Sequence, residues 1–125
     1  MTARAQGEYY VKSKLRPRME NSGSVMVLVG ENTKNLYRFV RWELDLALEL
    51  GKPLIVVNLN DERKIDRGRC PPIIGNACAM HIPFKLATIK YALDTWPRAL
   101  RGLDGEQRAR GPRHYLPDTY TAPGL

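Results

Sequence analysis

The chain has 125 residues, of which 43% are hydrophobic, and its formal charge at neutral pH is +7. This length and composition predict one folded domain with a modest core and exclude a largely disordered chain. No apolar run is long enough to span a bilayer, and the N-terminus lacks the hydrophobic segment of a secretory signal. The two cysteines, Cys70 and Cys78, are too few for a disulfide scaffold. We expect both to be reduced thiols in the cytoplasm.

The excess positive charge lies outside the centre of the chain. Residues 25–60 are neutral, because four basic side chains balance four acidic ones there. The other arginines and lysines are scattered over the two ends and one loop, a distribution typical of a solvated surface. Without a recognisable nucleic-acid-binding motif, nucleic acid is not expected to be the main partner.

The first predicted element is a helix over residues 8–20. Val11, Leu15 and Met19 recur at a helical spacing, with basic residues between them. The polar cluster 21-NSGS-24 then predicts a loop.

A strand, a helix and a second strand follow within about 35 residues. The run 25-VMVLVG-30 is short and continuously apolar, which predicts a strand buried on both faces. Asn32 or Thr33 is expected to cap a helix that ends at Leu50, and 54-LIVVNLN-60 predicts a second buried strand. This βαβ unit predicts two parallel strands joined by a right-handed crossover, and hence an α/β sheet with flanking helices.

The second half of the chain is predicted to be less regular. After a polar excursion over residues 61–76, we expect a short strand around 79–84 and a helix from Leu86 that is stopped by 96-WP-97. Residues 98–125, rich in Gly, Pro and Arg, are predicted to be an irregular basic tail. Its tyrosines Tyr115 and Tyr120 could attach it to the body of the domain.

Glu43 is the most unusual residue of the predicted 32–50 helix. At about 100° per residue it falls near the middle of the apolar face. The apolar residues within roughly 60° of it on the wheel are Leu36, Phe39, Val40, Leu46, Ala47 and Leu50. Burying an unpaired carboxylate is costly, so two explanations remain open. Glu43 is either a structural carboxylate paired with an arginine or backbone donors, or a functional group beside a crevice at the carboxyl ends of the strands.

Other candidate sites are weaker. Trp42 is either packing or a wall of a ligand site, and Gly30 could allow a ligand to approach the backbone closely. A metal site built from Cys70, Cys78, His81 and His114 matches no usual zinc spacing, so no metal is expected. We expect His81 to pack within or beside the third strand.

Taken in order, 21-NSGSVMVLVGENTKN-35 and 39-FVRWELDLALELGKPLIVVNLN-60 resemble the TIR-like domains of bacteria, including those of Thoeris antiphage systems. The resemblance covers about residues 10–97 and implies a flavodoxin-like parallel sheet. Active members of this family cleave the nicotinamide–ribose bond of NAD+, and some cyclise the product into a signal for a partner effector. The resemblance implies that NAD+ is a substrate rather than a cofactor. Glu43 matches the family's catalytic glutamate.

The resemblance also implies which other residues would contact the nucleotide. These are Gly30, Asn32 and Thr33 in the loop, with Trp42 as a wall. Two other readings remain, a non-catalytic module that associates with itself or with other TIR-like proteins, and a small basic nucleic-acid binder.

The chain departs from the family at its N-terminus. TIR-like domains normally begin with a strand, a helix and a second strand that have no counterpart here, so we expect an N-terminally incomplete domain over residues 1–97. The strand at 25–29 would then expose an apolar edge, and catalysis by this chain alone would lack half of the crevice.

Overall fold

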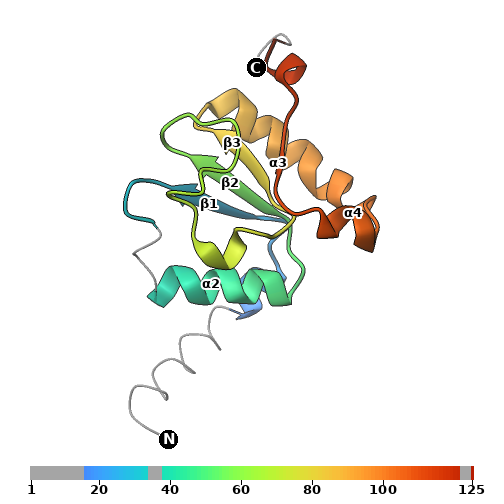
Figure 1. Ribbon diagram of the computed structural model, residues 1–125. Helices are drawn as coiled ribbons and strands as arrows, with labels where there is room; N and C mark the ends of the chain where they lie inside the picture. Colours follow the sequence, from blue (N-terminus) through green and yellow to red (C-terminus); the bar gives the residue numbers. More distant parts are fainter. Residues whose placement is uncertain (1–15, 34–37, 122–124) are drawn as a thin grey trace, which may run out of the picture.

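Within the described residues, four parallel strands form a single sheet in the order β1-β2-β3-β4. Figure 1 labels the first three of them side by side. The computed structural model describes residues 16–33, 38–121 and 125, with the side chains of 38–40 left out. The strands are β1 (Val25–Val29), β2 (Leu54–Asn58), β3 (Met80–Pro83) and β4 (Arg113–His114). Helices lie on both faces, so the predicted α/β parallel sheet with flanking helices is confirmed.

The predicted βαβ unit is present, with helix α2 (Arg38–Glu49) between β1 and β2. The two strands pair in parallel, with Val25 opposite Leu54 and Val29 opposite Asn58. Backbone N–H groups of Gly51 and Lys52 donate to the carbonyls of Leu48 and Ala47, at 3.2 and 3.0 Å. Gly51 has a φ of 66°, so the helix ends in a Schellman motif that a side chain would strain.

The predicted cap of this helix adjoins residues that the structure does not describe. The described part of α2 begins at Arg38, directly after residues 34–37, which lie outside the described residues, so the cap at Asn32 or Thr33 stays a prediction. The hydroxyl of Thr33 accepts a hydrogen bond from the backbone N–H of Gly30, which turns the chain at the end of β1.

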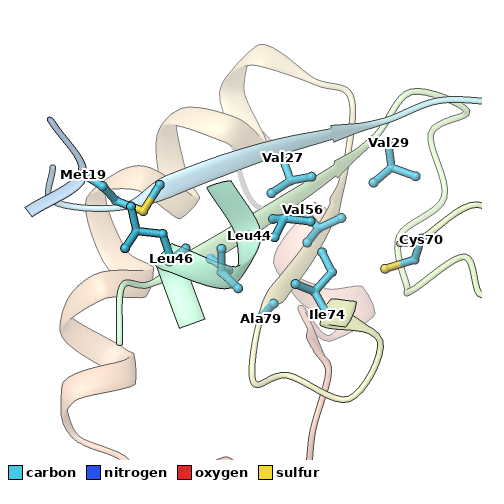
Figure 2. Packing of buried hydrophobic residues seen from close by; sticks show 11 residues of the cluster. Met19, Val27, Val29, Leu44, Leu46, Val56, Cys70, Ile74 and Ala79 are labelled. Carbon is cyan, nitrogen blue, oxygen red and sulfur yellow. The ribbon is translucent and has the colours of Figure 1, made fainter. Parts of the chain in front are cut away.

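The face of the sheet toward α2 carries the larger hydrophobic core. Figure 2 shows side chains of β1, β2 and α2 meeting there, together with residues of the 61–79 segment. That segment contains a short 3-10 helix, η2 (Pro72–Ile74), whose Ile74 is fully buried. The core consists of Met19, Val27, Val29, Leu44, Leu46, Ala47, Leu54, Val56, Cys70, Ile74 and Ala79.

The opposite face is covered by helix α3 (Leu86–Arg101), which lies over β2 and β3. Its core consists of Ile55, Val57, Met80, Ile82, Ala92, Trp96 and Leu100. Strand β2 is therefore buried at every position, as predicted. Strand β1 was predicted to be buried on both faces, and this was wrong. Val27 and Val29 are buried, whereas Met26 and Leu28 remain 46% and 49% exposed because α3 does not extend over the edge strand.

The C-terminal residues are more regular than predicted. Helix α3 does not stop at Pro97 but runs on to Arg101, because Trp96 and Leu100 continue its buried stripe. It is followed by helix α4 (Gly105–Ala109), strand β4 beside β3, and the 3-10 helix η3 (Pro117–Thr121). The prediction of an irregular 98–125 tail was therefore wrong.

Two tyrosines of this C-terminal segment attach it to the body, as predicted. Tyr115 packs edge-on against Tyr91 of α3, with ring centroids 5.2 Å apart. Tyr120 is buried, and the guanidinium of Arg63 lies 4.3 Å from its ring centroid.

The helix predicted over residues 8–20 falls largely outside the described residues. Residues 16–20 are helical, and Met19 contributes to the core.

Candidate active site

Glu43 lies on α2 and faces the free edge of the sheet. The helical wheel predicts that it points toward the sheet, but the sheet ends at β1, so the carboxylate is exposed rather than buried. Its neighbours Leu44 and Ala47 are buried in the core. The free-energy cost of burying an unpaired carboxylate therefore does not apply to Glu43.

A pocket of about 260 Å³ separates Glu43 from the edge strand. Its wall is strand β1 together with Thr33 and two residues of α2, and it is lined by Val25, Met26, Val27, Leu28, Thr33, Glu43 and Leu44. Of the described residues in that lining, Glu43 is the one that carries a charge. A carboxylate beside a largely apolar strand edge can stabilise a developing positive charge on a bound group.

The turn after β1 forms one end of this pocket. The Thr33 hydroxyl accepts from the Gly30 backbone N–H at 2.7 Å and donates to the Leu28 carbonyl at 3.5 Å. A Cβ on residue 30 would lie 3.3 Å from Leu59 Cδ1 and 3.7 Å from Thr33 Oγ1. Gly30 therefore allows the turn to close tightly beside the neighbouring loop.

Of the five predicted site residues, the structure brings Glu43 and Thr33 to one pocket. Gly30 adjoins it through its hydrogen bond to Thr33. Asn32 is exposed and Trp42 is half-buried, and neither lines the pocket. The wall formed by β1 itself was not predicted as part of the site. The exposed strand edge noted in the sequence was the signal that could have indicated it.

The cysteines and histidines do not form a site. Among the described residues, no group of three or more His, Cys, Asp or Glu side chains is placed to hold a metal ion. Burial raises the pKa of the Cys70 thiol to about 11, so this residue is a poor nucleophile. His81 is fully buried in β3, as predicted. Burial, with a smaller contribution from Arg67 and His114, lowers its pKa to about 4.

Within the described part of the chain, no helix is both long and apolar enough to cross a membrane.

Comparison with known proteins assigns the first half of the chain. The family described as "Thoeris protein ThsB, TIR-like domain" matches residues 2–64, which is half of the chain and includes β1, α2 and β2. A Cytobacillus dafuensis protein named as a candidate cyclic ADP-D-ribose synthase, TIR2, is 38% identical over 61 residues. That alignment covers 49% of this chain but only 15% of the relative. The order of the matched elements, the parallel sheet and the family match agree, and the chain belongs to the TIR-like domain family of the Thoeris protein ThsB.

Proposed function

We propose that this domain takes part in cleaving the nicotinamide–ribose bond of NAD+, with Glu43 as the catalytic carboxylate. The observation that carries the proposal is the pocket in which Glu43 faces the edge of β1. The family match and the name of the Cytobacillus dafuensis relative support NAD+ as the substrate.

The chemistry suits an exposed carboxylate that lines a pocket. When the C–N bond between ribose and nicotinamide breaks, nicotinamide leaves with the bonding electrons and the ribose becomes oxocarbenium-like. A carboxylate beside the ribose stabilises that charge and accepts hydrogen bonds from the ribose hydroxyls. Attack by water gives ADP-ribose, whereas attack by a nucleophile of the same molecule gives a cyclic product.

The size and charge of the pocket limit what it can hold. At about 260 Å³ it lies below the roughly 300–1,000 Å³ typical of pockets that enclose a whole ligand. Among the described residues, its lining contains no lysine or arginine to pair with a pyrophosphate. We therefore propose that it receives the reacting nicotinamide–ribose end, and that the rest of the nucleotide is held elsewhere or weakly. A high KM for the isolated chain follows.

The other predicted contacts keep smaller roles in this proposal. Gly30 and Thr33 shape the end of the pocket and support its wall. Asn32 would reach a bound nucleotide from the exposed side of the same turn. Trp42, which lies beside Glu43 on α2, would form a wall of the ligand site.

The test is NAD+ consumption by the purified chain at high protein concentration, compared with Glu43→Gln. We expect the variant to lose at least about 100-fold in turnover, the loss typical of removing one group that stabilises transition-state charge. Asp45→Asn is the matched control, because Asp45 is an exposed carboxylate on the same helix that does not line the pocket. Equal turnover in the wild type and Glu43→Gln would exclude Glu43 as the catalytic group.

A second candidate function is a non-catalytic assembly module, and the exposed apolar side chains of β1 favour it. A folded chain without NAD+ turnover, whose self-association survives Glu43→Gln, would support it over catalysis. In either case we propose a role in bacterial antiphage defence or nucleotide signalling, with an effector protein as partner. The free cysteines Cys70 and Cys78 support a reducing, cytoplasmic setting.

A further inference from the structure

Among the described residues, the backbone groups on the outer edge of β1 have no partner strand. The Val25 N–H donates to Pro53 O, and Val29 O accepts from the Leu59 N–H, at 2.8 and 2.9 Å. In a parallel ladder the residues that face one neighbour alternate with those that face the other. Val25, Val27 and Val29 therefore turn their backbone groups toward β2, whereas Met26 and Leu28 turn theirs away from the sheet. Within the described residues, no strand pairs with that outer edge.

This edge lacks the features that normally prevent strand pairing. Natural edge strands are guarded by lysines, prolines, bulges or very short length. The stretch from Asn21 to Gly30 contains no charged residue and no proline, and β1 is five residues long. Met26 and Leu28 add two half-exposed apolar side chains on the face that α3 leaves open.

We propose that β1 pairs antiparallel with β1 of a second copy of this chain, across a twofold axis at Val27. The outward-facing residues Met26 and Leu28 lie one on each side of Val27. The axis therefore places Met26 of one copy opposite Leu28 of the other, and each such pair exchanges two backbone hydrogen bonds. The edge is thus complementary to itself. The carbonyl of Leu28 also accepts the Thr33 hydroxyl at 3.5 Å, and its second lone pair is available to the partner.

The pairing also has a consequence for the side chains. Opposite residues of an antiparallel pair share a face, so Met26 and Leu28 of both copies join into one apolar patch on the α3 side. Neither strand contributes a charge to the contact. Both α2 helices come to lie on the other face of the joined sheet. The proposal does not depend on NAD+ cleavage.

Sedimentation velocity over a concentration series tests the interface. We expect the wild type to shift from monomer toward dimer as its concentration rises, and Leu28→Lys to raise the dissociation constant at least tenfold. Leu28 is half-exposed, so a lysine there can extend into solvent in the folded monomer. Leu116→Lys is the matched control. Leu116 is 71% exposed and follows β4 at the opposite edge of the sheet, so dimerisation should be unchanged.

A cysteine crosslink tests the register and remains informative if Leu28→Lys fails to fold. Opposite residues that are not hydrogen-bonded to each other have Cα atoms about 4.5 Å apart, within the range for a disulfide. In a Cys78→Ser background, Val27→Cys should therefore form a disulfide-linked dimer with oxidised glutathione, read by non-reducing electrophoresis. Val29→Cys on the same strand and face is the control. Its two copies would lie about four residues apart along the strand pair, too far to bridge.

Three results would overturn the proposal. The first is a wild type that stays monomeric at its highest soluble concentration. The second is a dimer that Leu28→Lys leaves intact, and the third is crosslinking of Val29→Cys as efficient as that of Val27→Cys.

Discussion

At the scale of single residues, Asn58 shows how a buried polar side chain positions a loop. It is the last residue of β2 and is fully buried. Its amide nitrogen donates to the carbonyls of Glu62 and Lys64, each at 2.9 Å. One buried side chain therefore fixes two backbone carbonyls of the loop that leaves β2 at the carboxyl end of the sheet.

Replacing this side chain should destabilise the protein. In Asn58→Ala two loop carbonyls lose their donor, and we expect the free energy of unfolding to fall by about 2–3 kcal/mol. Urea denaturation measures this difference. Asn60→Ala, which removes an exposed hydrogen bond to Asp66, is the control and should change stability by less than about 1 kcal/mol. Equal losses in the two variants would show that burial at Asn58 does not matter.

At the scale of elements, α3 shows that packing can override a strong local signal. Pro97 removes one hydrogen bond from the helix interior and crowds the carbonyl of Leu93, at a cost of about 3 kcal/mol. Continuing the helix keeps Trp96 and Leu100 buried against the sheet. Each of these side chains contributes about 1.5–3 kcal/mol, so together they offset the cost of the proline.

This balance predicts that Pro97→Ala stabilises the protein. The variant regains the hydrogen bond. Alanine also raises the conformational entropy of the unfolded chain, which lowers the free energy of unfolding by roughly 1 kcal/mol. The free energy of unfolding should therefore rise by about 2 kcal/mol. Thermal and urea unfolding followed by circular dichroism would measure it. Pro72→Ala is the matched control, since Pro72 stands at the first position of η2 where its missing N–H is not needed. A loss of stability in Pro97→Ala would mean that proline at this position is required for the packing of α3.

At the scale of the whole molecule, His81 links stability to pH. It lies in the interior of the sheet, between Val56 on β2 and His114 on β4 in the strand register. Its pKa is lowered from 6.5 to about 4, mainly by burial and further by the positive charge of Arg67 and by His114. The unfolded state therefore binds a proton between these two pH values when the folded state does not. Stability is unaffected by His81 above pH 6.5 and falls as the pH drops toward 4.

The expected decrease is up to about 3 kcal/mol, since each pKa unit corresponds to about 1.4 kcal/mol. Urea titrations at a series of pH values would measure it. In His81→Leu the carboxylates still titrate but the histidine does not, so the variant should lose less stability than the wild type between pH 6.5 and 4. Parallel pH profiles for the two proteins would contradict a buried, neutral His81.

The sequence predicts the central βαβ unit well because its signals are local. The apolar runs of β1 and β2 and the turn at Gly51 each depend on a few neighbouring residues. Where the sheet ends is not a local property. The half-exposure of Met26 and Leu28 follows from α3 lying over β2 and β3 only. The exposure of Glu43, despite its place on the wheel, follows from β1 being the edge strand beside α2. Strand β4 could not be predicted for the same reason, because its two residues pair with β3 through contacts distant in sequence.

The two edges of the sheet differ in what they offer another molecule. Strand β4 is two residues long, pairs only with Met80 and His81, and follows Gly111, whose φ is 87°. It provides too few backbone groups to hold a further strand. In the part of the chain that the structure describes, the β1 edge is the one long enough to hold a further strand, so a chain that pairs through it binds one other copy. Its association should therefore saturate at two copies, and concentrated solutions should yield a closed pair rather than growing fibres.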